Sequence, residues 1–200
     1  MIAVTGLMRS GTTPLAMMLH QMGVSMGKFM CFPIHNNHPH LEWEDAVFTS
    51  VLMNQFEGDE AVVMEDFLHH YIEGREREAG GEAWGVKTPF MLPYIPQLEK
   101  VCEELGVELT LIVTRRNYDD TVVSLHRQMD YLEQGSGIRS QVLDFQSSLE
   151  KFCVTASFSA EIFEFKDTKE RPHMVAQRLA SLVGLEIDLD VTLIGIEGIV

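Results

Sequence analysis

Residues 6–13, with the sequence GLMRSGTT, have the residue types and spacing of a loop that binds phosphate. The two glycines fit the pattern G-x-x-x-x-G-K-[ST], but Thr12 occupies the lysine position and Arg9 stands three residues earlier. A turn from a strand into a helix offers backbone N–H groups and the positive end of the helix dipole to an anion. Ser10, Thr12 and Thr13 add hydroxyl donors, and Arg9 adds a guanidinium. The stretch therefore predicts a site for a phosphate-like group.

The loop differs from that of an NTPase in more than its lysine. An NTPase also needs Mg²⁺, which is held by the loop hydroxyl and by an aspartate that follows another strand. The clearest later strand of this chain ends IVTRR, at Arg115 and Arg116, without a carboxylate at its tip. We therefore expect an anion site that works through arginine and hydroxyl groups, and no metal.

Cationic and hydroxyl side chains stand at the ends of three predicted strands. The loop 6–13 follows the first strand, Lys87 and Thr88 end the second, and Arg115 and Arg116 end the third. The carboxyl ends of parallel strands lie at one edge of a sheet, where α/β proteins bind their ligands. We therefore expect these side chains to form one site.

The pattern of apolar residues predicts strands that alternate with helices. Strands are expected at residues 2–5, 82–89, 107–116 and 160–165, and residues 61–66 could form another short strand. Helices are expected at residues 13–22, 45–56, 96–105, 119–132, 139–152 and 171–183, and a solvated loop at residues 73–84. This alternation indicates an α/β fold of three layers, with a mainly parallel sheet flanked by helices.

Length, composition and charge limit the classes of partner. The 200 residues are 46% hydrophobic and 22% charged, as expected for one domain over residues 1–200. A net charge of −15 repels nucleic acid, so a local cluster of donors must hold any anionic ligand. The three cysteines are widely spaced, which predicts neither a disulfide framework nor a zinc site and favours the cytoplasm. No segment reads as a signal peptide or a membrane helix, so we expect no membrane partner.

These motifs resemble those of the PAPS-dependent sulfotransferases, in particular the bacterial type. RSGTT after an apolar strand is similar to the loop that binds the 5′-phosphosulfate of PAPS (3′-phosphoadenosine 5′-phosphosulfate) in that family. The family's second signature is an arginine after a strand with a serine eight residues later, and Arg116 and Ser124 have that spacing. The resemblance covers nearly the whole chain and implies the P-loop NTPase-like fold of the sulfotransferases.

The resemblance also implies a reaction and roles for individual residues. The protein would move a sulfuryl group from PAPS to a hydroxyl or amine of a small, neutral or cationic acceptor. Arg116 and Ser124 would bind the 3′-phosphate of PAPS, and Arg9 and Lys87 would stabilise charge on the bridging and leaving oxygens. The loop residues expected to bind the cofactor are Arg9, Ser10, Gly11, Thr12 and Thr13.

Two features of the family are missing from the sequence. The residues before position 200 contain no Gly-rich, Lys-bearing loop of the kind that covers the 3′-phosphate in the cytosolic enzymes. The cytosolic enzymes also place a catalytic histidine just after Lys-Thr, and some glycan-modifying members place a glutamate just before the lysine. Here these positions hold Pro89 and Val86, so the general base must come from another segment.

Acidic residues and histidines after the first helix are the candidate bases. Glu44 is favoured because it lies in the segment where bacterial sulfotransferases carry acidic residues near the acceptor, and His40 and Glu65 come next. His35, His38 and His40 have a spacing that could also bind zinc or nickel. No cysteine stands in matching register, so an acceptor-binding loop is the preferred interpretation of the three histidines.

Two other functions remain open. A P-loop kinase would use the same loop, although the lysine and the carboxylate that it needs are absent. A nucleotide-binding module without catalysis would be consistent with the short chain and the unidentified base. Turnover of Mg-ATP would indicate the kinase, and binding of PAP (3′-phosphoadenosine 5′-phosphate) without sulfuryl transfer would indicate the module.

Overall fold

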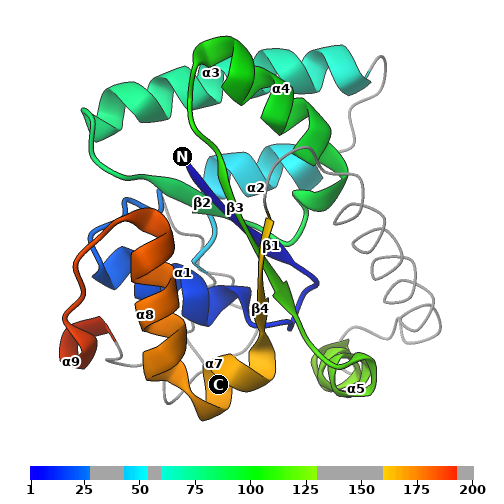
Figure 1. The fold of residues 1–200 in the computed structure, drawn as a ribbon. Helices are drawn as coiled ribbons and strands as arrows, with labels where there is room; N and C mark the ends of the chain where they lie inside the picture. Colours follow the sequence, from blue (N-terminus) through cyan, green and yellow to red (C-terminus); the bar gives the residue numbers. More distant parts are fainter. Residues whose placement is uncertain (28–42, 54–59, 130–159, 193–200) are drawn as a thin grey trace.

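The computed structural model describes residues 1–27, 43–53, 60–129 and 160–192 (Figure 1). The predicted helix at residues 139–152 and the three histidines of residues 35–40 lie outside these ranges. Within the described ranges, no helix combines the length and the apolar character that crossing a bilayer requires.

A parallel sheet forms the middle layer of the molecule (Figure 1). Its strands, in spatial order, are β2 (Gly85–Lys87), β1 (Ile2–Gly6), β3 (Thr110–Arg115) and β4 (Ala160–Glu164). Each neighbouring pair is parallel, so all four carboxyl ends point the same way. The predicted α/β class with a parallel sheet is confirmed.

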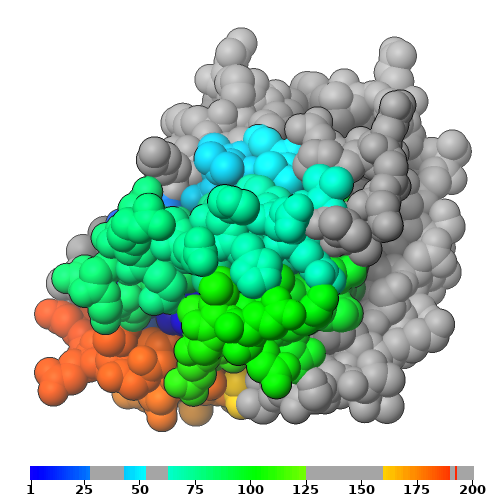
Figure 2. Space-filling view, turned by 90° about the horizontal axis from the view of Figure 1, so that it is seen from above, coloured from blue at the N-terminus to red at the C-terminus, as the bar shows by residue number. Residues whose placement is uncertain are grey.

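Helices cover both faces of the sheet, because both faces are apolar (Figure 1). The helices on one face are α2 (Ala46–Met53), α3 (Glu60–Ala79) and α4 (Ile95–Leu105), and those on the other are α1 (Thr12–Gln21) and α8 (Pro172–Val183). In β1, Ala3 belongs to the first core while Ile2 and Val4 belong to the second, as the alternation of side chains along a strand requires. Figure 2 shows α3 and α4 side by side over the first face.

Four further elements complete the described part of the chain. They are a 3₁₀ turn, η1 (Leu92–Tyr94), and the helices α5 (Tyr118–Met129), α7 (Phe165–Glu170) and α9 (Leu189–Thr192). The glycines predicted to end two helices do so: Gly106 after α4 and Gly184 after α8 both have φ 67°, a left-handed conformation that glycine adopts without steric cost. The predicted strand at 160–165 ends one residue earlier, and the helix α7, which begins at Phe165, was not predicted.

The two predictions for residues 61–84 are wrong. The short strand expected at residues 61–66 is part of α3, and most of the loop expected at residues 73–84 is the end of the same helix. Met64, Leu68 and Ile72 recur every four residues and are buried against the sheet. This helical period outweighs the local strand preference of the two valines before Met64, because burial of a continuous stripe stabilises the whole helix.

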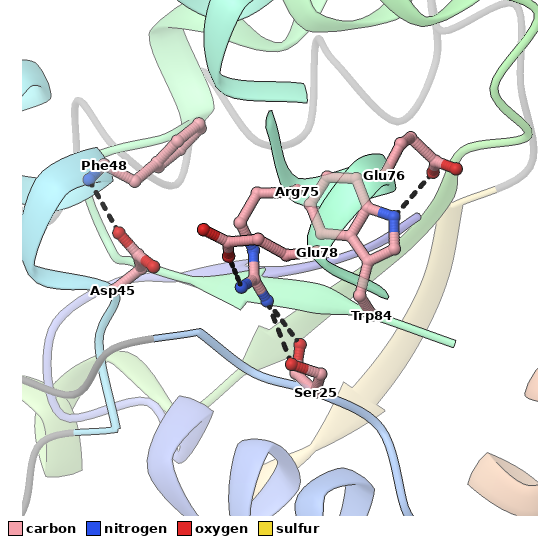
Figure 3. A network of polar contacts seen from close by, with 7 residues as sticks. All are labelled: Ser25, Asp45, Phe48, Arg75, Glu76, Glu78 and Trp84. Carbon is pink, nitrogen blue, oxygen red and sulfur yellow. Dashed lines mark hydrogen bonds and ion pairs between the residues drawn. The ribbon is translucent and has the colours of Figure 1, made fainter. Parts of the chain in front are cut away.

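Arg75 joins the charged end of α3 to the rest of the fold through a network of polar contacts (Figure 3). Its guanidinium donates hydrogen bonds to the carbonyl and hydroxyl oxygens of Ser25, at 2.9 and 3.2 Å, and to Glu78 Oε2 at 3.0 Å. Its Cζ also lies 5.4 Å from the centre of the Trp84 ring, whose Nε1 donates to Glu76 Oε1 at 2.6 Å. Ser25 in turn forms a parallel bridge with Trp84, so the network fastens α3 to the edge of the sheet.

We predict that Arg75→Met lowers the free energy of unfolding by about 1.5–3 kcal/mol, because it removes charge-assisted hydrogen bonds from a side chain that is only 11% exposed. Urea unfolding followed by circular dichroism measures the change. Arg77, two residues further along the helix and exposed, is the matched control. Arg77→Met should change stability by less than about 0.5 kcal/mol. Equal effects of the two substitutions would contradict this account of α3.

Candidate functional site

The loop between β1 and α1 has the backbone of an anion-binding turn. Arg9 has φ 69° and Gly11 has φ 98°, so both adopt left-handed conformations. Gly11 is the N-cap of α1, and no described side chain caps the helix. The backbone N–H group of Ser10 closes the turn by donating to the Leu7 carbonyl at 3.0 Å. The N-terminus of α1, which begins at Thr12, is therefore directed at the loop, as an anion site requires.

Ser10 fixes the loop to the neighbouring strand. Its hydroxyl is buried and lies 2.5 Å from Thr114 Oγ1 in β3. In the same place Gly6 must lack a side chain, because a Cβ there would lie 2.1 Å from Thr114 Oγ1. The sequence predicts that the Ser10 hydroxyl donates to a phosphate, and in the structure this hydroxyl shares a hydrogen bond with Thr114 in which either oxygen can be the donor. Thr12 and Thr13, at the start of α1, carry the other hydroxyls of the loop.

Arg9, Arg116 and Ser124 come together beside the loop. Arg116 Nη1 donates to the Arg9 carbonyl oxygen at 3.0 Å, and Arg9 Nε donates to Ser124 Oγ at 3.2 Å. The serine lies on α5, whose Val122 packs against Leu7 in the loop. Two sequence motifs that lie more than 100 positions apart along the chain thus contribute three residues to one hydrogen-bonded cluster, whose arginine and hydroxyl groups are of the kind that bind anions.

The two consecutive arginines at the end of β3 have different partners. Arg115 is exposed and forms an ion pair with Glu164 at the end of β4. Arg116 turns to the loop, and its Cζ lies 4.3 Å from the centre of the Phe165 ring. Beside this stack is a groove of about 1040 Å³ whose lining includes Arg116, Tyr118 and Phe165. The groove lies at the carboxyl ends of β3 and β4, where a sheet of this class binds ligands.

Lys87 and Glu44, which the sequence assigns to separate roles, form one ion pair. Lys87 Nζ donates to Glu44 Oε1 at 2.8 Å, and the side chains are 2% and 6% exposed. Lys87 ends β2, opposite Val4 of β1, two residues before the loop begins at Gly6. The pair therefore lies at the same edge of the sheet as the loop. Two buried charges of opposite sign can supply a proton acceptor and a cation to one reaction centre.

The residue after Glu44 is held by the fold. Asp45 Oδ1 accepts a hydrogen bond from the backbone N–H of Phe48 at 2.9 Å and so caps α2. A Cβ at Gly27 would lie 2.2 Å from Asp45 Oδ2, so the carboxylate is packed on that side. Burial raises the pKa of Tyr71, and the nearby Asp45 carboxylate raises it further. Asp45 thus has a structural role, and of these two neighbouring carboxylates Glu44 is the one that pairs with Lys87.

Of the two other candidate bases, the structure describes Glu65, which lies away from the loop. Glu65 lies on α3 and pairs with Lys100 of α4 at 2.6 Å, on the outer side of the helical layer. This hydrogen bond raises the pKa of Lys100, as expected for an ordinary surface pair. His40 lies outside the described residues. In the part of the chain that the structure describes, no three His, Cys, Asp or Glu side chains are grouped closely enough to hold a metal ion.

Thr114 and Phe165 contribute to the site but were not identified from the sequence. Thr114 is the last threonine of the predicted strand 107–116, and its register opposite Gly6 could be found only from the strand pairing. Phe165 ends the predicted strand 160–165, and its place at a strand tip was a usable indication. Each residue contacts a site residue that is distant in the sequence: Thr114 contacts Ser10, and Phe165 contacts Arg116.

Comparison with solved structures identifies the fold. The chain superposes on the sulfotransferase STF1 from Mycobacterium tuberculosis H37Rv with a TM-score of 0.63 and 16% identity, over 96% of this chain and 68% of that one. On STF9 from Mycobacterium avium the TM-score is 0.63 and the identity 13%, over 96% of this chain and 65% of that one. On the sulfotransferase domain of the curacin biosynthetic pathway the TM-score is 0.59 and the identity 15%, over 95% of this chain and 75% of that one. Neither a protein-family model nor a curated protein sequence matches the chain. The protein therefore has the sulfotransferase fold, over about two thirds to three quarters of the length of these structures.

We predict that Glu44→Leu lowers the free energy of unfolding by about 3–5 kcal/mol, because Lys87 would keep a buried charge without its partner. The double variant Glu44→Leu/Lys87→Met should recover most of this loss, since both charges are then removed. Urea denaturation of the three proteins measures both effects.

The exposed pair of Glu65 and Lys100 supplies the control for this experiment. Glu65→Leu should leave the unfolding midpoint unchanged within error, because solvent screens the charges of an exposed pair. A double variant no more stable than Glu44→Leu alone would show that Lys87 and Glu44 are not coupled.

Proposed function

We propose that this protein is a sulfotransferase that moves a sulfuryl group from PAPS to a hydroxyl or amine of a small acceptor. The observation that carries the proposal is the contact among Arg9, Arg116 and Ser124 beside the loop. These residues form two motifs in the sequence, and a hydrogen-bonded cluster of anion-binding groups results only when the sheet places β3 beside β1. The sulfotransferase fold of the chain supports the same reaction class.

The donor set beside the loop fits the two phosphate groups of PAPS. The start of α1, with its backbone N–H groups and the hydroxyls of Thr12 and Thr13, would hold the 5′-phosphosulfate. The guanidinium of Arg116 and the hydroxyl of Ser124 would hold the 3′-phosphate. The fork of an arginine matches the geometry of a phosphate. Four carboxylates line the groove beside this cluster, and two of them, Glu164 and Asp167, are paired with Arg115 and Arg171.

PAPS supplies an activated sulfuryl group, whose transfer leaves negative charge on the departing phosphate. Residues that donate to oxygens at that point stabilise the transition state more than the ground state. We assign this role to Arg9 and Lys87. Arg9 is exposed at the loop, and its Nε contact with Ser124 fixes the direction of the side chain. Lys87 lies opposite Val4, two residues before β1 ends at Gly6. Its side chain is buried, so water does not screen its charge.

Glu44 is the proposed general base. Its carboxylate is held 2.8 Å from Lys87 Nζ, so a proton taken from the acceptor would arrive next to the cation that stabilises the leaving group. Accepting this proton would neutralise Glu44. The carboxylate would then no longer offset the positive charge of Lys87, which would act more strongly on the leaving group. The pair thereby links proton removal to charge stabilisation. The net charge of −15 favours a neutral or cationic acceptor over a sulfated or phosphorylated one.

We predict that calorimetric titration with PAP shows binding without Mg²⁺, and that Arg116→Ala weakens it by about 10- to 100-fold because a charge-assisted contact is lost. Arg115→Ala is the matched control. This neighbouring arginine pairs with Glu164, so its removal should leave the affinity within about twofold. Preference for Mg-ATP over PAP would assign the protein to the kinases instead, and PAP binding without transfer to any acceptor would indicate a binding module.

We predict that Arg9→Ala lowers turnover by about 10²–10³, as removal of one transition-state donor does.

Glu44→Gln should lower kcat by about 10²–10⁴ while PAP affinity stays unchanged, because the amide still accepts a hydrogen bond from Lys87 but cannot take a proton. Steady-state rates with an acceptor identified in a screen provide both values. Glu65→Gln is the control with normal rates, and a Glu44→Gln enzyme as fast as the wild type would exclude Glu44 as the base.

A further inference from the structure

Phe165, which follows β4, contacts two parts of the phosphate site. It is the first residue of α7, directly after β4, and its ring is partly buried at the edge of the groove. One contact is with Gly11, since a Cβ built there would lie 2.5 Å from Phe165 Cδ2. The other is with Arg116, whose Cζ lies 4.3 Å from the centre of the ring. The aromatic ring thus lies between the N-cap of α1 and the guanidinium at the end of β3.

The contact with Gly11 explains why this position must be glycine. A side chain there would be strained at φ 98° and would also overlap the aromatic ring. The ring thereby closes the side of the loop that faces β4. The Gly11 backbone, which sets the direction of the first N–H groups of α1, is held on one side by Phe165 and on the other by the Ser10–Thr114 hydrogen bond.

The contact with Arg116 orients a guanidinium that would otherwise have several rotamers. A guanidinium that lies over an aromatic face keeps its N–H groups at its rim, directed away from the ring. One of these groups, Nη1–H, donates to the Arg9 carbonyl. The ring contact and this hydrogen bond together define the plane of the guanidinium before an anion arrives, which reduces the side-chain entropy lost on binding.

We propose that Phe165 is a positioning residue for the 3′-phosphate site, which it prepares through Arg116 without contacting the phosphate. This inference rests on the function proposed above and adds a residue to it. It predicts that the aromatic character of Phe165 matters for ligands with a 3′-phosphate. An apolar side chain of similar size would still contact Gly11 but would not orient Arg116.

Calorimetric titrations of Phe165→Leu and Phe165→Tyr with PAP and with AMP test the proposal. Phe165→Leu should weaken PAP binding by roughly fivefold, the size of a cation–π contact, and leave AMP binding nearly unchanged because AMP has no 3′-phosphate. Phe165→Tyr keeps the aromatic face and should restore the wild-type affinity for PAP. In the background of Arg116→Ala, the leucine substitution should have no further effect on PAP binding, because the group through which it acts is gone.

Phe163 provides the matched control on the same strand. Its ring is buried and also carries an arginine, with Arg178 Cζ at 4.4 Å, but it belongs to the core beneath α8. Phe163→Leu should lower the unfolding midpoint and leave the affinity for PAP unchanged. A loss of PAP affinity in Phe163→Leu equal to that in Phe165→Leu would attribute both losses to general destabilisation and overturn the proposal.

The remaining outcomes separate this inference from the proposed function. Equal weakening of PAP and AMP by Phe165→Leu, retained in the Arg116→Ala background, would mean that the ring contacts the nucleotide directly, and would overturn the positioning role alone. If the wild-type protein binds PAP and Phe165→Leu binds it equally well, the positioning role is likewise overturned. A wild-type protein that binds neither nucleotide would overturn the proposed function itself, and the role of Phe165 in it.

Discussion

The close approach of β1 and β3 is the constraint on which the site depends. The register places Gly6 opposite Thr114, and there is no room between them for a Cβ. This approach lets the buried hydroxyl of Ser10 reach Thr114, and the hydrogen bond ties the loop to the strand that carries Arg116 at its end. A residue larger than glycine at position 6 would separate the strands and, with them, the two halves of the anion site. The backbone geometry of the sheet, rather than any single cation, therefore brings the donors together.

Much of the architecture could be predicted from the sequence, because its causes are local. Apolar runs and helix-ending glycines identify β1, β3, α4 and α8 by patterns within a few residues. The end of α3 could not be read in this way. Its charged sequence is typical of a solvated loop. Only the structure shows that Arg75 binds Ser25, which lies fifty residues away in the sequence. Burial of a charged side chain with distant partners leaves no periodic trace in the sequence.

The same distinction applies to the candidate site. The spacing of the motifs singles out Arg9, Arg116 and Ser124, since the distances between residues within a strand–turn–helix unit are fixed by the unit itself. The ion pair of Lys87 and Glu44 could not be predicted, because it joins two separate units. The sequence treats these two residues as independent, and only the fold shows that a change in one must alter the other. Side chains that act in pairs across units are the part of a site that sequence motifs describe least.

Positive backbone φ angles occur in the loop and directly before Glu44. Among the described residues, Arg9 and Trp43 are the non-glycine residues with positive φ, at 69° and 53°; Arg9 lies in the loop, and Trp43 directly precedes Glu44. Such conformations are costly for bulky side chains and persist only where the surroundings determine them. At Arg9 the determining contacts are the hydrogen bonds with Arg116 and Ser124. At Trp43 the residues that follow are fixed, since Glu44 pairs with Lys87 and Asp45 caps α2. At Arg9, the hydrogen bond that Arg116 donates to the Arg9 carbonyl also orients the guanidinium of Arg116, so relaxing the strain would move a group that the proposed reaction needs.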